Sequence, residues 1–101
     1  SFFKNPIINK NQFLQLKRKF PDIKYFITTN NKIKVSAGWL IENIGLKGYR
    51  IGDAGTHKKQ ALVIVNYGKA SGKEILNLSK KIQKEVNDNY GIKIETEVNI
   101  I

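Results

Sequence analysis

Glu97 carries a carboxyl group that could act as an acid or a base, and it lies near the end of the chain. In the alternating segment from Lys93 to Ile101 it falls on the polar face together with Glu95. Position alone favours a solvated side chain on that face. If the same face lines a cleft, partial desolvation would adapt Glu97 to proton transfer. The periodicity of the segment does not decide between these two interpretations.

Three further polar side chains have chemically useful types. Ser1 would fit an N-terminal nucleophile activated by its own amine, but nothing in the sequence identifies the oxyanion hole that such an enzyme needs. His57 and Gln60 flank a predicted strand, where a lone histidine is more often a structural hydrogen-bonding residue and a glutamine can orient a ligand. With one histidine and no cysteine, the sequence argues against a His-based triad or a protein-built zinc site, and no metal is expected.

A glycine-rich segment offers a different kind of site. Residues Ile44–Ile51 match the I-G-x-x-G-x-x-I pattern of KH domains, whose GxxG loop holds a single-stranded nucleic-acid backbone. A helix cap at Gly45 followed by an irregular loop explains the same residues. A KH loop joins two helices, whereas here a second glycine-rich segment, Gly52–Gly55, follows within four residues. A nucleic-acid-binding module that uses the Gly45–Gly48 loop is therefore the alternative function.

The composition indicates one folded domain with an anionic partner. The chain has 101 residues, 41% of them hydrophobic, and no apolar run near the roughly 18 residues that a membrane span requires. Its formal net charge of +10 suits nucleic acid, an anionic membrane face or a phosphorylated small molecule. Only Arg18 and Arg50 among the 18 basic residues are arginine, the type that leads in bidentate recognition of bases and phosphates. Because methionine is absent, we expect that a leader was removed or that the chain is a piece of a longer protein.

Apolar periodicity and turn residues predict a succession of helices and strands. In chain order these are an extended segment at 1–6, a helix at 9–20, a hairpin with strands at 25–29 and 32–35, a short helix at 37–44, a buried central strand at 61–66, a long helix from the capping box Ser71–Glu74 to Gly91, and a last strand at 93–101. Residues 45–55 are expected to form an irregular loop. The whole predicts a single compact α+β domain, in which an N-terminal helix, a short helix and a long C-terminal helix pack on a small mixed or antiparallel sheet.

Three of these elements have apolar faces. The residues expected to be buried are Trp39, Leu40 and Ile44 in the short helix, Ile75, Leu78, Ile82 and Val86 in the long helix, and Ile92, Ile94, Thr96 and Val98 in and just before the last strand.

Five motifs then occur together along the chain. They are SFFKNP at Ser1–Pro6, AGWLIE at Ala37–Glu42, GLKG at Gly45–Gly48, His57 with QALV at Gln60–Val63 leading to Asn66, and ETEV at Glu95–Val98. With these motifs in this order, residues 1–101 resemble the C-terminal, substrate-binding domain of the UDP-N-acetylenolpyruvoylglucosamine reductases. The residues between Pro6 and Ala37 resemble the insertion found in the longer subclass of that family.

The resemblance implies an NADPH- and FAD-dependent oxidoreductase of bacterial peptidoglycan synthesis, a UDP-N-acetylmuramate dehydrogenase. Such enzymes convert UDP-N-acetylglucosamine enolpyruvate to UDP-N-acetylmuramate in the cytoplasm. By this resemblance FAD is bound by other domains of the same polypeptide, so the isolated chain is expected to hold no cofactor, to be inactive and to bind substrate weakly at best. Neither a membrane nor a nucleic acid is a partner under this interpretation.

The resemblance also implies roles for individual residues. Ser1 would donate a proton to the substrate carbon that carries the carboxylate, while Glu97 would assist as an acid and stabilise the enolate-like intermediate. Asn5, Lys47 and Gln60 match positions that contact the UDP-sugar, with Lys47 as a point charge toward phosphate or nucleotide.

The sequence departs from the family pattern at two places. Asn99 stands where some members have a basic residue, which leaves a nucleotide contact at that position open. Ser1 is the first residue, so the glycine that usually precedes it is not part of this sequence, and its order as a free terminus is an open point.

Overall fold

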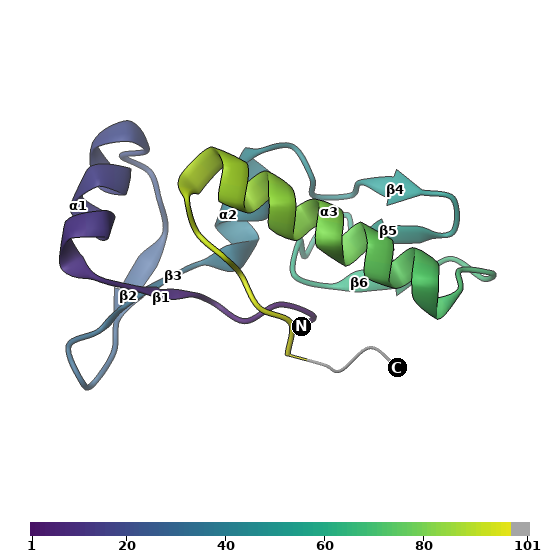
Figure 1. Ribbon diagram of the computed structural model, residues 1–101, viewed down its shortest axis with the longest axis horizontal. Helices are drawn as coiled ribbons and strands as arrows, with labels where there is room; N and C mark the ends of the chain where they lie inside the picture. Colours follow the sequence, from purple (N-terminus) through teal and green to yellow (C-terminus); the bar gives the residue numbers. More distant parts are fainter. Residues whose placement is uncertain (98–101) are drawn as a thin grey trace.

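The computed structural model describes residues 1–97, along which helices alternate with short strands (Figure 1). The elements are β1 (Ile7–Ile8), α1 (Lys10–Lys19), β2 (Tyr25–Ile27), β3 (Ile33–Val35), α2 (Ala37–Asn43), β4 (Arg50–Ile51), β5 (Ala54–Thr56), β6 (Ile64–Asn66) and α3 (Gly72–Tyr90). The predicted α+β class is confirmed. In place of one sheet, these strands form two three-stranded antiparallel sheets, in the orders β1-β3-β2 and β4-β5-β6.

One end of the molecule is built from α1 and the first sheet, as Figure 1 shows. The helix begins after Asn9, whose side-chain oxygen accepts a 2.8 Å hydrogen bond from the Gln12 backbone N–H. The Phe13 ring packs against Tyr25 of β2, with the ring centroids 4.4 Å apart. The predicted helix and hairpin are both confirmed. In the hairpin turn Asn31 has a φ of 58°, a left-handed value that asparagine tolerates well.

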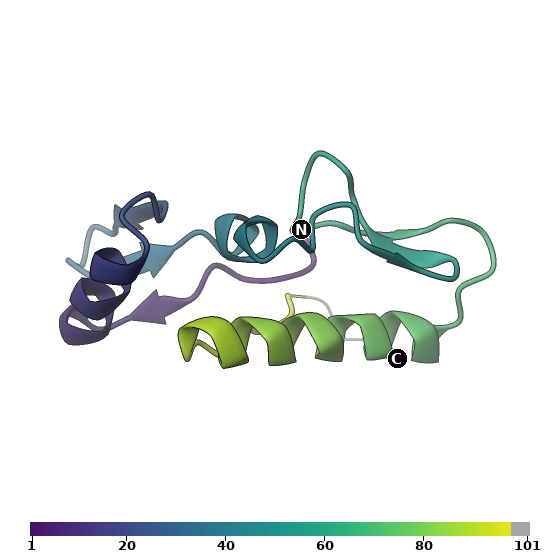
Figure 2. The ribbon, with the colours of Figure 1, turned by 90° about the horizontal axis from the view of Figure 1, so that it is seen from above.

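The rest of the molecule has two layers. In Figure 2, α3 forms one layer, and α2 with the second sheet forms the other. Leu78, Ile82 and Val86 on α3 are buried, which confirms its predicted apolar face, although Ile75 is only half-buried. These side chains share one hydrophobic core with Leu40 of α2.

The burial predicted for the short helix is partly wrong. Leu40 is buried, but Trp39 and Ile44 are half-buried and pack at the margin of the core. The helical positions that the core takes instead are Ala37 and Ile41, both fully buried. The apolar stripe of α2 is therefore rotated away from the tryptophan, which is left facing partly outward.

Both ends of α3 are as predicted. The Ser71 hydroxyl accepts a 3.1 Å hydrogen bond from the Glu74 backbone N–H, and the Glu74 carboxylate accepts one of 3.3 Å from the Ser71 backbone N–H. Gly91 ends the helix in the left-handed region at φ 67°. None of the helices within residues 1–97 combines the length and the hydropathy that crossing a membrane requires.

The irregular loop predicted at 45–55 is wrong for its second half, which forms the β4–β5 hairpin. Gly52 in its turn has a φ of 57°, a left-handed value that favours glycine. A Cβ at Gly55 would lie 2.9 Å from the Tyr49 carbonyl oxygen, so only glycine allows this close approach. Strands of two and three residues are too short to produce a detectable alternation of polar and apolar residues.

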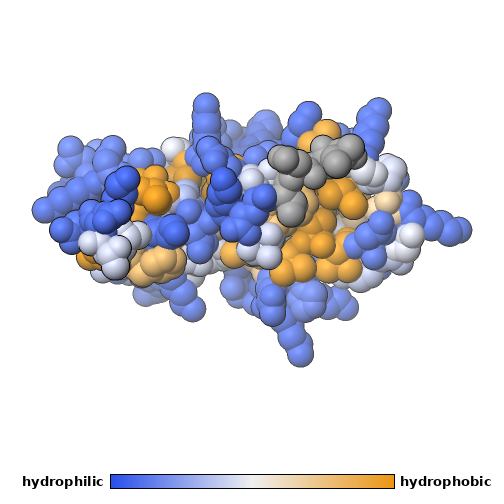
Figure 3. All heavy atoms as spheres, turned by 90° about the horizontal axis from the view of Figure 1, so that it is seen from below, coloured by the Kyte–Doolittle hydropathy of each residue, from blue (hydrophilic) through white to orange (hydrophobic). Residues whose placement is uncertain are grey.

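The buried central strand predicted at Ala61–Asn66 is also wrong. The strand β6 begins only at Ile64, and it is the edge of its sheet, with β5 as its neighbour. A hydrogen bond of 3.0 Å from the Val63 N–H to the Gln60 carbonyl closes a turn that keeps the preceding residues out of the sheet. Residues 62–65 are half-buried. On the face in Figure 3, hydrophobic side chains gather in the half of the molecule that holds this sheet.

The last described residues run beside the first ones, and the strand predicted at 93–101 is reduced there to one antiparallel bridge between Phe3 and Thr96. Two backbone hydrogen bonds of 2.8 Å form this bridge, one from the Lys4 N–H to the Glu95 carbonyl and one from the Glu97 N–H to the Phe2 carbonyl. Residues 98–101 lie outside the described residues, and with them the predicted positions of Val98 and Asn99.

The predicted alternation of this segment is confirmed as far as residue 97. Ile92 and Ile94 are buried and Thr96 is half-buried, whereas Lys93, Glu95 and Glu97 are exposed. The polar face of the segment thus carries Glu97 to the surface beside the first residues of the chain.

Candidate functional site

Ser1 and Glu97 meet although 96 positions separate them in the sequence. The Ser1 hydroxyl donates a 2.7 Å hydrogen bond to Oε2 of Glu97. Two backbone hydrogen bonds hold the neighbouring segments together: the Glu97 N–H donates to the Phe2 carbonyl at 2.8 Å, and the Phe2 N–H donates to the Leu62 carbonyl at 2.6 Å. Both side chains are exposed. A hydroxyl in contact with a carboxyl group provides a path along which a proton can move to a bound ligand.

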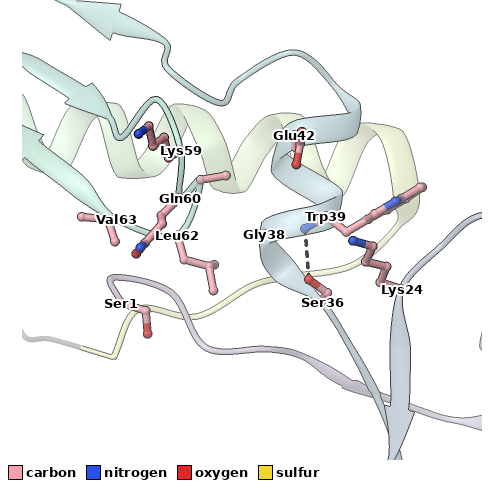
Figure 4. Close-up of a pocket in the computed structure, with 11 residues that line it drawn as sticks. Ser1, Lys24, Ser36, Gly38, Trp39, Glu42, Lys59, Gln60, Leu62 and Val63 are labelled. Atoms are coloured by element: carbon pink, nitrogen blue, oxygen red, sulfur yellow. Dashed lines mark hydrogen bonds between the residues drawn. The ribbon is translucent and has the colours of Figure 1, made fainter.

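A cavity of about 340 Å³ opens beside Ser1, between α2 and the segment that precedes β6 (Figure 4). In this view Lys24 and Trp39 lie on one side of α2, and Gln60 and Leu62 lie on the other. A Cβ at Gly38 would lie 3.6 Å from the Leu62 side chain, an ordinary van der Waals distance, which shows that α2 and the opposite wall are in close contact at this point.

The lining of the cavity combines positive charge with apolar surface. Lys24 and Lys59 contribute ammonium groups, Trp39 contributes an indole ring, and Glu42 is the acidic residue among the lining residues that the structure describes. Leu62 and its neighbours form an apolar wall. Such a lining suits a ligand that carries negative charge and also has an apolar or ring-shaped part.

Gln60 lines the cavity, and the loop that carries it is fixed by His57. The His57 N–H donates a 2.8 Å hydrogen bond to the Val63 carbonyl, and its Nδ1 accepts one of 3.0 Å from the Lys59 N–H. The structural role predicted for His57 is therefore confirmed. Gln60 itself is exposed and lines the cavity, so its side-chain amide can contact a ligand there.

Asn5 is not among the residues that line this cavity. Its side-chain oxygen accepts a 2.9 Å hydrogen bond from the Ala37 N–H, at the start of α2. The same residue borders a separate hollow of about 310 Å³, next to Lys4 and Lys93. Since the oxygen of Asn5 is used by the fold, its amide nitrogen is the group that can donate to a ligand.

Lys47 also lies outside the lining, but its side chain forms an ion pair with Glu42, which is a lining residue. Its Nζ is 2.6 Å from Oε1 of Glu42, which does line the cavity. Of the predicted site residues, Ser1 and Gln60 therefore line one cavity. Glu97 and Lys47 do not line it, but each contacts a residue that does, Ser1 and Glu42 respectively. Asn5 borders a separate hollow.

Sequence reasoning missed the charged and aromatic residues of the lining, which are Lys24, Trp39, Glu42 and Lys59. Trp39 and Glu42 stand three positions apart within the AGWLIE motif, and that spacing puts them on one side of a helix. The AGWLIE motif therefore carries a signal for the cavity as well as for the core. Lys24 comes from a distant segment, and nothing local to its sequence position indicates the cavity.

The alternative site at Gly45–Gly48 gains no support from the structure. This loop joins α2 to β4, whereas the nucleic-acid-binding loop of a KH domain joins two helices. Within residues 1–97, no three histidine, cysteine, aspartate or glutamate side chains are grouped as a metal site requires.

Comparison with known proteins gives a consistent result. Residues 1–101 match the sequence family described as "UDP-N-acetylenolpyruvoylglucosamine reductase, C-terminal domain". Proteins with the name UDP-N-acetylenolpyruvoylglucosamine reductase are 59% identical to the whole chain in Flavobacterium johnsoniae, 50% identical to the whole chain in Idiomarina loihiensis, and 47% identical over 99% of the chain in Pseudomonas savastanoi. The chain spans 30% of the length of each of these relatives.

Proposed function

The chain belongs to the family of the C-terminal domain of UDP-N-acetylenolpyruvoylglucosamine reductase, and on that premise we propose that it is the substrate-binding domain of such a reductase. The complete enzyme would convert UDP-N-acetylglucosamine enolpyruvate to UDP-N-acetylmuramate for bacterial peptidoglycan, in the cytoplasm. The observation that carries this proposal is the contact between Ser1 and Glu97 at the edge of a cavity lined by lysines.

The Ser1–Glu97 pair suits the proton-transfer half of this reaction. Reduction of the enolpyruvyl group adds a hydride to the methylene carbon and a proton to the neighbouring carbon, which carries the carboxylate. As the hydride adds to the methylene carbon, negative charge develops on the neighbouring carbon and on the carboxylate attached to it. We assign the proton to the Ser1 hydroxyl, and Glu97, whose Oε2 lies 2.7 Å from that hydroxyl, acts as the acid that returns a proton to Ser1. The same acid stabilises the enolate-like charge.

The positive charges around the cavity suit the substrate. Lys24 and Lys59 line the cavity that Ser1 borders, and Lys47 lies one contact away. A UDP-sugar carries two phosphate groups, and ammonium groups attract them as point charges. Gln60 and the amide nitrogen of Asn5 would add directed hydrogen bonds. Under this proposal the net charge of +10 draws a diphosphate substrate toward the site.

FAD and NADPH are the cofactors that this function requires, and we assign them to the part of the polypeptide outside this chain. Both sheets formed by residues 1–97 are antiparallel, whereas the Rossmann dinucleotide-binding fold is built on a mostly parallel sheet, so these residues do not form a Rossmann-type site. Bound flavin would supply the hydride. The proposal accordingly expects the isolated chain to be inactive.

A spectroscopic experiment on the full-length protein tests the proposed function. The protein should be purified yellow, lose its flavin absorbance when NADPH is added, and regain it when UDP-N-acetylglucosamine enolpyruvate follows. UDP-N-acetylglucosamine, which lacks the enolpyruvyl group, is the control and should not restore the colour. A colourless protein, or one whose reduced flavin is not reoxidised by the enolpyruvyl sugar, would contradict the proposal.

A further inference from the structure

Glu42 is the acidic residue among the described lining of the cavity, and it contacts a cation that does not line it. Its Oε1 lies 2.6 Å from Nζ of Lys47. The lysine side chain is 33% exposed and the glutamate side chain 55% exposed, so solvent still reaches the pair. An ammonium group has three donors. With one of them used by Glu42, two remain for an incoming anion.

The backbone places Lys47 against Glu42. α2 ends in a Schellman motif, in which the Leu46 N–H donates to the Ile41 carbonyl at 3.1 Å and the Gly45 N–H donates to the Glu42 carbonyl at 3.0 Å. Gly45 takes the left-handed conformation that this motif needs, at φ 79°. The motif turns the chain back over the last turn of the helix, so that residue 47 meets residue 42.

Hydrogen bonds to Thr56 also fix the backbone of the loop that follows the Schellman motif. Leu46 is buried, and its carbonyl accepts a hydrogen bond from the hydroxyl of Thr56, a residue that is itself buried. The Tyr49 N–H donates to the same hydroxyl at 2.9 Å. With the backbone fixed on both sides of Lys47, the position of its ammonium group depends on the side chain, and Glu42 is the residue that holds that side chain.

The position of Glu42 in α2 is unfavourable for the helix alone. Carboxylates stabilise the first turn of a helix and destabilise the last, because the backbone dipoles leave negative partial charge at the C-terminal end. Glu42 is the next-to-last residue of α2, and the last turn of that helix holds no basic residue. The contact with Lys47 offsets this cost. A role in orienting Lys47 accounts for an acidic residue here better than helix stability does.

We propose that Glu42 is a positioning residue for substrate binding, which holds the Lys47 ammonium group at the edge of the cavity, ready for a phosphate of the substrate. The inference rests on the proposed function, because it assumes that the substrate is a UDP-sugar. It adds a residue that acts through Lys47 rather than by touching the substrate. A lysine that is already ordered loses less conformational freedom when the phosphate binds.

A double-mutant cycle in the full-length enzyme tests this role. Glu42→Ala should raise the KM for UDP-N-acetylglucosamine enolpyruvate about tenfold, as expected when a hydrogen bond to a charged group is weakened. It should leave kcat within about twofold, because the chemical step uses other residues. Glu42→Gln keeps an oxygen that can accept a hydrogen bond from Lys47, so its KM should lie between that of the parent enzyme and that of Glu42→Ala. Glu85→Ala, which removes the exposed Lys81–Glu85 ion pair, is the matched control and should not change KM.

Non-additivity separates positioning from a general structural effect. In a Lys47→Ala enzyme, adding Glu42→Ala should raise KM no further, because the group that Glu42 holds is gone. Additive effects of the two substitutions, or an unchanged KM in Glu42→Ala, would overturn the inference and leave the proposed function standing. If Lys47→Ala itself left KM unchanged, the phosphate contact assumed in the proposed function would be wrong, and the inference would fall with it. Should Glu42→Ala not fold, the cycle is run with Glu42→Gln, and melting temperatures report folding of every variant.

Discussion

The Ser1 hydroxyl lies 2.7 Å from a carboxylate oxygen of Glu97, so the first and the last described residues of the chain form one contact. The residues next to this contact are held by the core. Phe3, two positions after Ser1, is buried in the core and forms the bridge to Thr96 next to Glu97. Burial of one aromatic ring thereby fixes the relative position of two exposed polar groups, which is what a proton-transfer pair needs.

Removing the Ser1 hydroxyl should impair one half of the proposed reaction. In the full-length enzyme, Ser1→Ala should slow reoxidation of the reduced flavin by the enolpyruvyl sugar about 10²- to 10⁴-fold, the range for a lost acid–base group. Reduction of the flavin by NADPH should be unchanged, because it needs no proton from Ser1. Stopped-flow absorbance measures the two half-reactions separately. Thr29→Ala, on an exposed part of the hairpin, is the control. Equal slowing of both half-reactions would contradict the role of Ser1.

Two substitutions of Asn5 should have different effects on stability and on substrate binding. Asn5→Ala leaves the buried Ala37 N–H without its partner, which should lower the free energy of unfolding by about 1–3 kcal/mol. Asn5→Asp keeps an accepting oxygen at the start of α2, so it should stay close to the stability of the parent chain. Because it loses the amide donor and gains a negative charge, it should still raise the KM for the UDP-sugar. Urea denaturation and steady-state kinetics check the two parts. An Asn5→Asp enzyme with parental KM would show that Asn5 does not contact the substrate.

The phenol of Tyr90 should make stability depend on pH in the alkaline range. Burial raises the pKa of Tyr90, while the hydrogen bond from Asn43 acts in the opposite direction. The raised pKa means that the folded chain retains the phenol proton when the unfolded chain, with a tyrosine pKa of about 10, begins to lose it. The contribution of Tyr90 to stability is therefore full below about pH 10 and declines as the pH rises further.

Tyr90→Phe isolates this effect. The substitution removes the hydrogen bond to the Leu40 carbonyl, so at neutral pH it should lower the free energy of unfolding by about 1 kcal/mol. Since phenylalanine does not titrate, the difference between the two chains should shrink as the pH rises past about 10. Denaturation curves at several pH values measure it. A difference that grows with pH would show that the sign of the shift is wrong.

The helices show how much local sequence can predict. The Ser71–Glu74 capping box and Gly91 specified both ends of α3, because caps act through hydrogen bonds within a few residues. The hairpin around Asn30–Asn31 followed in the same way from turn chemistry. The β4–β5 hairpin and the edge position of β6 were not predicted, because two- and three-residue strands are selected by their partners and by Gly55 packing on the Tyr49 carbonyl.

The candidate site was predictable only through resemblance. Periodicity placed Glu97 on a polar face but not against Ser1, since a contact between the two ends of the chain depends on the whole fold. Lys24 and Lys59 reach the cavity from separate segments, and a surface lysine has no local signature. The contact between Glu42 and Lys47 depends on the turn at Gly45, where the sequence predicts a helix cap but not which side chains that cap brings together.

The isolated chain should lack the activity of the complete enzyme. Residues 1–101 purified alone should take up no FAD on incubation and should not oxidise NADPH in the presence of UDP-N-acetylglucosamine enolpyruvate, because the proposed cofactor sites lie elsewhere in the polypeptide. Absorbance spectra after gel filtration and an NADPH assay check both points. Substrate-dependent NADPH oxidation by the isolated chain with added FAD would contradict this assignment.

The most direct test of the account compares Glu97→Gln with Glu95→Gln in the full-length enzyme. Glu95 stands two positions earlier on the same exposed face, so the control removes the same charge from the same segment. The quantity to measure is the rate at which the enolpyruvyl sugar reoxidises the NADPH-reduced flavin. The account predicts that Glu97→Gln lowers this rate by about 10²-fold or more and leaves flavin reduction intact, while Glu95→Gln changes neither. Equal rates in the two variants would contradict the proposed proton transfer through Ser1 and Glu97.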